Sequence, residues 1–362
     1  MKVVLCQPAD LGPAEIGRWR QLQREDPRQA NPFLAPEFAL VLARHRPNTW
    51  VAVLEDGSGI AGFFPFHRGR FGVGRALGYG VSNLQGVVHA PGLEWEASDL
   101  LARCGLAVFE FDEFQPDHCQ RLAPSHAESE PAPFTDLSAG FDVWLKTKLA
   151  TSRALKAIQR KHRKLEREVG EVSFTFDCRR GDTLDLLMRW KSQQYRRTGR
   201  FDRFAWPWFR SAFTELVEVS TADFAAVRSV LSVDGRPVAI EQSLCANGIL
   251  SDWFPAYDVN VATYSPGQVC FLEIFRESGR HGVHQVDFGK GYAQHKEIFK
   301  DGDHAVAAGW AERRSVVATL RRAQQAPRRR TLEFVLARPA LRQAARKMLD
   351  NVGQVRTTWG RG

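Results

Sequence analysis

Two carboxylates, Asp287 and Glu241, are the residues best placed to do chemistry. Asp287 lies at the end of a short apolar strand expected over 285–288 and is followed by the glycine-flanked turn Phe288-Gly289-Lys290-Gly291. Strand ends line ligand crevices in α/β folds, so this carboxylate could accept a proton or orient a hydroxyl or amine; it could equally cap the turn. Glu241 follows the apolar run 238–240 in an expected central strand. There it could be a general base with a raised pKa, or it could face solvent.

An anion site is predicted where a strand gives way to a helix, at Tyr264, Ser265, Pro266, Gly267 and Gln268. The N–H groups at a helix start carry the positive end of its dipole and bind phosphate favourably. We expect Ser265 to be the N-cap, Pro266 the first helical residue, and Gly267 the point where a ligand approaches the backbone. Ser-Pro also begins helices that bind nothing, so a plain helix start stays open.

Three further residues are candidates for contact with a substrate. Trp253 and Tyr257 lie in one expected strand and could form a stacking platform for a sugar, or simply core. Lys296 could neutralise a phosphate or carboxylate, or be solvated. His281 and His284 lack a third ligand, and the six cysteines form no C-x-x-C pair, so no metal site is predicted.

The charge of the chain is concentrated in two segments. The formal net charge is +9. Residues 144–169 hold 9 basic and 2 acidic side chains (net +7), and residues 311–362 hold 13 and 3 (net +10), so the remainder is mildly acidic. Either segment could contact RNA, an anionic membrane surface or another acidic partner, or be a solvated helix face. A protein that is basic throughout is excluded.

Alternating patterns and turn residues predict the elements that position these groups. Strands are expected over 225–233, 237–246 and 249–257, because Asp234-Gly235 and Asn247-Gly248 are tight-turn pairs. A helix is expected from 264–268 to about Arg280, and one amphipathic basic helix over 144–169. Residues 124–133, rich in Pro, Ser, Ala and Glu, are interpreted as a linker.

Length and hydropathy indicate more than one domain and a cytoplasmic location. With 362 residues, 44% of them hydrophobic, the chain can form substantial cores. No apolar run approaches the roughly 18 residues of a membrane span, and no secretory leader is evident. Scattered thiols are typical of a reducing compartment. We therefore expect a cytoplasmic protein of at least two domains, whose oligomeric state the sequence leaves open.

The order of several short motifs resembles a known family. The motifs are Asn31 to Pro36, the basic helix with Arg153, Arg160 and Arg163, Asp234 to Ala239, Ala256-Tyr257-Asp258, Ser265-Pro266-Gly267, and Val286 to Gly291 with Lys296-Glu297. Together they resemble the CelD/BcsL-like branch of the GNAT acyltransferase superfamily, bacterial proteins associated with cellulose and other exopolysaccharide production. The likeness covers about residues 30–300.

The resemblance implies an α/β (α+β) fold of two GNAT-like halves in tandem, with mixed sheets flanked by helices. The expected domains are 1–133, a catalytic domain at 134–310 and a basic helical tail at 311–362. Residues 264–268 would hold the pyrophosphate of acetyl-CoA as co-substrate, and the acceptor would lie near Glu241, Trp253 and Asp287. His295 stands where the family has Tyr; it could be an acid or base near the substrate or a packing residue.

The leading hypothesis is an acyl-CoA-dependent acyltransferase that acts on a hydroxyl or amine of a sugar-containing acceptor. The acyl group that it transfers is expected to be acetyl. Asp287 and Glu241 would be its catalytic pair. The first alternative, drawn from the related FemABX enzymes, changes the donor to aminoacyl-tRNA, which the two basic segments could contact. The second alternative is a GNAT-like scaffold without catalysis in a polysaccharide-synthesis complex.

Overall fold

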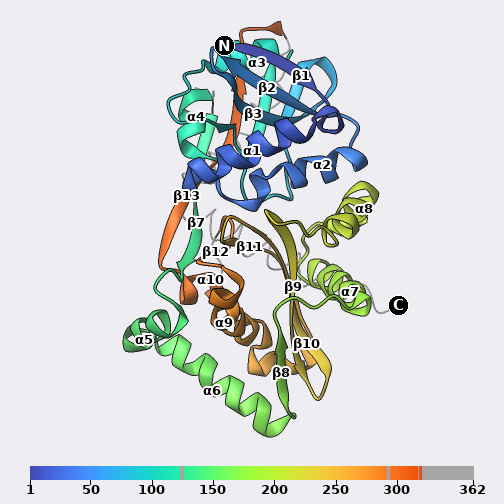
Figure 1. Cartoon of the computed structure of the whole chain (residues 1–362). Helices are drawn as coiled ribbons and strands as arrows, with labels where there is room; N and C mark the ends of the chain where they lie inside the picture. Colours follow the sequence, from blue (N-terminus) through green and yellow to red (C-terminus); the bar gives the residue numbers. More distant parts are fainter. Residues whose placement is uncertain (123–125, 292–293, 317, 320–362) are drawn as a thin grey trace, which may run out of the picture.

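The computed structural model describes residues 1–122, 126–291, 294–316 and 318–319. Most of the predicted basic tail therefore lies outside the described residues. The fold is mixed α/β, with helices on both sides of a large mixed sheet (Figure 1). Within the described residues, no helix combines the length and the apolar character that a membrane crossing requires.

The same order of elements occurs twice along the chain. The first series is β1 (Lys2–Cys6), α1 (Pro13–Glu25), α2 (Pro36–His45), β2 (Thr49–Asp56), β3 (Gly59–Arg68), β4 (Val73–Ala76), α3 (Ala97–Arg103), β6 (Val108–Phe114), α4 (Pro116–Leu122) and β7 (His126–Asp136), with β5 (Val88–His89) beside β3. The second is β8 (Val172–Thr175), α7 (Gly181–Arg197), α8 (Pro207–Leu216), β9 (Phe224–Val233), β10 (Arg236–Ala246), β11 (Ile249–Tyr257), α9 (Pro266–Ser278), β12 (Gln285–Asp287), α10 (Gln294–Phe299) and β13 (Gly302–Glu312). In both, an antiparallel meander is followed by a helix and a parallel strand.

We call β1 to α4 the N-terminal half and β8 to β12 the C-terminal half. The final strand of each series runs alongside the other half: β7 pairs with β12, and β13 pairs with β6. These two strands also pair with each other, so the sheet runs in the order β1-β2-β3-β4-β6-β13-β7-β12-β11-β10-β9-β8. The crossed strands join the halves by backbone hydrogen bonds in addition to side-chain packing (Figure 1).

The hydrophobic core covers both faces of this sheet. One cluster spans the halves, where α1 and α2 meet α7 and α8 around Phe38, Phe213 and Trp253. A second lies between α9 and the sheet, with Leu250 and Val286 among its buried members. A third fills the N-terminal half around Phe64, Phe109 and Phe114. Packed helices and strands therefore support the sheet in both halves.

Two of the expected elements are wrong, and three strands are confirmed. The supposed linker at 124–133 contains most of strand β7, whose edges are covered by β12 and β13. The single basic helix is two helices, α5 (Phe141–Thr151) and α6 (Arg153–Glu168), separated at Ser152. Ser152 caps α6 by accepting the Leu155 N–H at 3.1 Å. Strands β9, β10 and β11 occur where their turns predicted them.

Candidate functional site

A fork between two parallel strands lies at the centre of the C-terminal half. Strands β11 and β12 pair over only three residues of each, from Ile249 with Gln285 to Ser251 with Asp287. Beyond this point β11 continues to Tyr257, whereas the other branch turns away through a loop. A β-bulge falls on the free part of β11 at Trp253, and bulges of this kind are frequent beside active sites. The fork leaves an opening in the sheet at Asp287.

Asp287 is buried at the apex of the fork, and both of its carboxylate oxygens accept hydrogen bonds. Its Oδ2 accepts the Asn31 amide at 2.6 Å and lies 3.5 Å from the Ser251 hydroxyl, and its Oδ1 accepts the Gly289 N–H at 2.9 Å. The turn-capping role left open by the sequence is therefore confirmed. Burial raises the pKa of this carboxyl above its ordinary value, while the bonds from Gly289 and Asn31 work against that rise.

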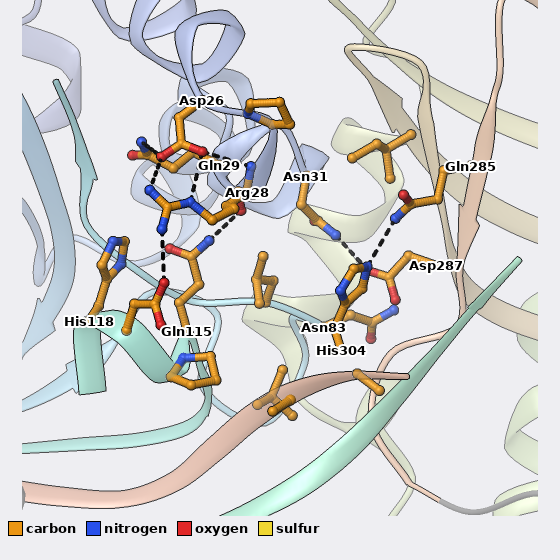
Figure 2. A pocket seen from close by; sticks show the side chains of 18 residues that line it. Asp26, Arg28, Gln29, Asn31, Asn83, Gln115, His118, Gln285, Asp287 and His304 are labelled. Carbon is orange, nitrogen blue, oxygen red and sulfur yellow. Dashed lines mark hydrogen bonds and ion pairs between the residues drawn. The ribbon is translucent and has the colours of Figure 1, made fainter. Parts of the chain in front are cut away.

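Asp287 also lines a cavity of about 350 Å³ between the two halves. Gln285, Asp287 and His304 approach it from the strands of the C-terminal side, and Arg28, Asn31 and Gln115 from the N-terminal half (Figure 2). Asn83 reaches the fork itself, since its amide donates to the Asp252 carbonyl at 2.5 Å. The sequence identified none of Asn31, Asn83, Gln115 and Gln285 as site residues, although Asn31 begins one of the motifs that carry the family resemblance.

Glu241 is not exposed and does not line this cavity. Its Oε1 accepts the N–H of the bulge residue Trp253 at 3.3 Å, and its Oε2 is buried without a partner. Burial, then the neighbouring Asp252, raises the pKa of Glu241 well above its ordinary value. The structure therefore places Glu241 behind β11, apart from Asp287, and does not bring the two predicted catalytic carboxylates into one groove.

Lys191 on α7 completes this buried group, and the sequence did not identify it. Its ammonium donates to the Pro255 carbonyl at 2.8 Å. Burial lowers the pKa of Lys191 to about 8, and the charges of Glu241 and Asp252 oppose that fall. No turn or motif distinguishes Lys191 from the other basic residues of α7, so only its place in the fold reveals it.

The predicted anion loop starts α9, and Ser265 is its N-cap residue, as expected. Pro266 is the first helical residue, as predicted, whereas Ser265 has a left-handed backbone (φ 53°) and its side chain does not cap the helix. Its hydroxyl accepts a hydrogen bond from Lys161 of α6 at 2.7 Å. The Tyr264 hydroxyl donates to Glu168 of the same helix at 3.1 Å. Helix α6 thus brings basic side chains to the start of α9.

The remaining predicted contact residues have different surroundings. Trp253 packs among Phe33, Phe38 and Phe213, and its indole N–H donates to the Val81 carbonyl at 2.6 Å. Trp253 is therefore a residue of the hydrophobic core, which is one of the two roles that the sequence left open. Tyr257 borders a second cavity of about 120 Å³.

Lys296 is half-buried rather than fully solvated. It donates to the Gly289 and Lys290 carbonyls at 3.1 and 2.9 Å, and burial lowers its pKa. The charges of Asp252 and Asp287 oppose this fall, so Lys296 lies under the influence of both carboxylates. The side chain of His295 lies outside the part of the chain that is described. Among the described residues, no three His, Cys, Asp or Glu side chains gather in a way that could hold a metal ion.

Comparisons with known proteins give the fold a name. Residues 152–297 match the family model described as acetyltransferase (GNAT) domain. No curated protein matches the chain. Among solved structures, FemX has a TM-score of 0.52 at 11% identity, with 86% of this chain and 96% of that chain covered. The C-terminal domain of a protein described as a lysylphosphatidylglycerol synthetase from Agrobacterium fabrum has a TM-score of 0.51 at 14% identity, with 84% and 93% covered.

At identities this low, likeness to solved structures shows the fold alone. The matched segment begins at Ser152, the cap of α6, and ends in α10, so it contains the fork, the buried carboxylates and the loop before α9. The family match confirms, at the level of the superfamily, the resemblance to a GNAT-type fold that the motifs predicted. The chain has the fold of the GNAT-superfamily acyltransferases.

Proposed function

We propose that the protein is an acyl-CoA-dependent acyltransferase that transfers an acetyl group to a hydroxyl or amine of a sugar-containing acceptor. The observation that carries the proposal is the position of Asp287, buried at the apex of the β11/β12 fork and exposed to a cavity on one side of it. The sugar-containing acceptor and the link to exopolysaccharide synthesis rest on the sequence resemblance.

The loop before α9 has the properties that a pyrophosphate needs. Backbone N–H groups at the helix start and the ammonium of Lys161 supply positive charge there. A Cβ added at Gly267 would lie 3.7 Å from Tyr257 and meet nothing closer, so the backbone is open at this position. CoA, when bound, supplies the thioester whose acyl group is transferred.

In the proposed reaction the acceptor attacks the acyl carbon directly. Asp287, as the carboxylate, takes the proton of the attacking hydroxyl or amine, the new C–O or C–N bond forms, and the C–S bond breaks with release of the CoA thiolate. The thiolate then takes a proton from water, and Asp287 returns its own proton to solvent. Glu241 acts as a positioning residue, since its buried carboxyl accepts the N–H of the β11 bulge. Backbone N–H groups of β11 beyond the point where it leaves β12 would polarise the carbonyl.

Calorimetric titration of the full chain with acetyl-CoA tests the donor site. Gly267→Trp should abolish binding because the indole fills the loop, whereas Gly267→Ala should leave the dissociation constant within about threefold, since its Cβ makes only ordinary contacts. Binding that survives Gly267→Trp in a folded variant would contradict the proposed location. Absence of binding to the wild-type chain would contradict the proposed donor.

A second candidate function is transfer from aminoacyl-tRNA. Its support is the fold likeness to FemX together with the basic side chains of α6, where Arg153, Lys156, Arg160, Arg163 and Lys164 are exposed. Binding to tRNA that weakens by a factor of about ten or more between 50 and 200 mM salt, with no response to acetyl-CoA, would favour this candidate. Binding of acetyl-CoA that is nearly insensitive to salt would favour the first.

A further inference from the structure

We propose that the cavity between the halves binds one uncharged sugar ring and selects against phosphorylated or otherwise anionic sugars. The inference deepens the proposed function, and it rests on that function for the choice of a sugar over another uncharged polyol. It concerns the side of the sheet opposite α9. Leu250 and Val286 point toward α9, and because side chains alternate along a strand, Ile249, Gln285 and Asp287 point into the cavity.

The polar lining offers acceptors for hydroxyl groups. Gln115 is 7% exposed; its amide N–H₂ donates to the Arg28 carbonyl, and its Oε1 is buried without a partner. Asn31 and Asn83 already donate their N–H₂ groups to Asp287 and to the Asp252 carbonyl. Sugar hydroxyls both donate and accept, and can therefore pair with the amide and carboxyl groups that line the cavity.

The charges of the lining disfavour an anion. Asp26, Asp117 and Asp287 contribute three carboxyl groups, against the one guanidinium of Arg28. That guanidinium is already paired, at 2.7 Å from Asp26 and 2.9 Å from Asp117.

His118 does not add positive charge to the cavity. Burial lowers its pKa to about 3, so it is neutral near pH 7, and its Nε2 lies 3.0 Å from Nε2 of His89. A phosphate in the cavity would therefore meet three carboxyl groups. Among the described lining residues, the guanidinium of Arg28 is already paired, and the remaining basic side chain is the imidazole of His304.

The size and the apolar part of the lining agree with a single ring. Leu84, Ile249 and Val306 line the cavity with aliphatic surface against which the C–H faces of a sugar can pack. A volume of about 350 Å³ lies at the lower end of the roughly 300–1,000 Å³ that small-molecule sites occupy. The dimensions suit one ring whose linkage points outward.

The test measures binding of glycosides to the full chain in the absence of any acyl donor. Methyl β-glucoside and methyl N-acetyl-β-glucosaminide are titrated beside glucose 6-phosphate and methyl β-glucuronide, with ligand-observed NMR as the readout. Ala305→Trp places an indole at an exposed position of the lining, and Ala150→Trp on the exposed face of α5 is the matched control. Thermal unfolding of both variants reports whether they fold.

The neutral glycosides should bind at least tenfold more tightly than the anionic sugars. Ala305→Trp should raise the dissociation constants of the neutral glycosides tenfold or more, whereas Ala150→Trp should leave these constants unchanged. Equal affinity for anionic sugars, no binding of any neutral glycoside, or indifference to Ala305→Trp would each overturn the inference. Acetyl-CoA titration of the same samples separates the two proposals. In the wild-type chain, absence of glycoside binding with acetyl-CoA binding intact contradicts only the cavity assignment, and absence of acetyl-CoA binding with glycoside binding intact contradicts only the donor.

Discussion

Asn31 and Asp287 are 256 positions apart in the chain, yet the Asn31 amide donates to the Asp287 carboxylate at 2.6 Å. Asn31 begins the short helical turn Pro32–Leu34 in the N-terminal half, where its own Oδ1 accepts the Phe33 N–H at 3.0 Å. One half of the molecule therefore fixes the orientation of the carboxylate that the other half places at the fork. The site proposed for catalysis is complete only when both halves are packed together.

Replacement of Asp287 by Asn should remove activity without unfolding the chain. The amide oxygen can still accept the Gly289 N–H, so the turn is retained, but the side chain can no longer take a proton. We expect the turnover rate to fall by a factor of about 10² to 10⁴, as is usual on loss of a general base. Steady-state kinetics beside thermal unfolding measure this. Asp185→Asn, on the exposed face of α7, is the control, and full activity in Asp287→Asn would exclude the proposed base.

Asn31→Asp should shift the pH dependence of the reaction upward. The new Oδ1 can still accept the Phe33 N–H, but a second carboxyl replaces the N–H₂ that stabilises ionised Asp287. Two carboxyls at hydrogen-bond distance share a proton, so the pKa of the pair rises. Because a base must be ionised, we expect the acidic limb of the rate profile to move to higher pH by about one unit or more. An unmoved limb with a lower plateau would indicate a purely structural role for Asn31.

Lys161→Ala should weaken binding of acetyl-CoA. The Lys161 ammonium lies at the start of α9, 2.7 Å from the Ser265 hydroxyl, where it adds to the positive end of the helix dipole. Loss of one charge-assisted contact to a pyrophosphate costs about 1.5–3 kcal/mol, so the dissociation constant should rise roughly tenfold or more. Calorimetry at two salt concentrations measures it. Lys156→Ala removes an equal charge from the exposed face of the same helix and should have little effect; equal losses would point to general electrostatics.

Some helices and strands of this fold can be predicted from their local sequence, whereas others depend on contacts with residues far away in the chain. The meander β9 to β11 was predicted because Asp234-Gly235 and Asn247-Gly248 each fix a turn within a few residues. Strand β7 was missed because Pro131 and Pro133 are poor strand residues, and the partners that cover it, β12 and β13, lie more than 140 positions further along the chain.

The site shows the same division between local and distant information. Asp287 was predicted from a local pattern, an apolar strand followed by a glycine turn. The cavity beside it was not predicted, because Asn31, Asn83 and Gln115 come from loops of the other half. The burial of Glu241 and Lys191 could not be predicted, because the sequence around a charged residue in a strand or helix does not reveal whether the fold will bury it beside a partner.

Glu113→Gln should make the stability of the protein less dependent on pH. Glu113 is buried, and burial raises the pKa of its carboxyl to about 8 from an ordinary 4.5. A carboxyl with a raised pKa is protonated in the folded state while the unfolded state has lost its proton. Its contribution is therefore full below about pH 4.5 and is lost as the pH rises toward 8. The slope is at most about 1.4 kcal/mol per pH unit.

Denaturant unfolding at pH 5, 7 and 9 checks this prediction. The amide oxygen that Glu113→Gln introduces can accept the Lys290 N–H, as the Glu113 carboxylate does at 3.4 Å. The free energy of unfolding of the variant should therefore rise relative to that of the wild type as the pH increases. Glu166→Gln changes an exposed carboxyl of α6 and should leave the wild-type profile unchanged. Parallel profiles for wild type and Glu113→Gln would contradict the assignment of the pH dependence to this group.

Lys191→Met should destabilise the fold, and a second substitution should recover part of the loss. Methionine keeps the length of the stem but removes the ammonium that lies near Glu241 and Asp252 and donates to the Pro255 carbonyl. Breaking a buried charge group by removing one partner typically costs about 3–5 kcal/mol, because the opposite charge is left unpaired. In Lys191→Met with Glu241→Gln, one of the two carboxyls is also neutral, so the double variant should unfold at higher denaturant than Lys191→Met alone. If the two substitutions change the free energy of unfolding in a strictly additive way, Lys191 and Glu241 do not interact, and each is an independent buried site.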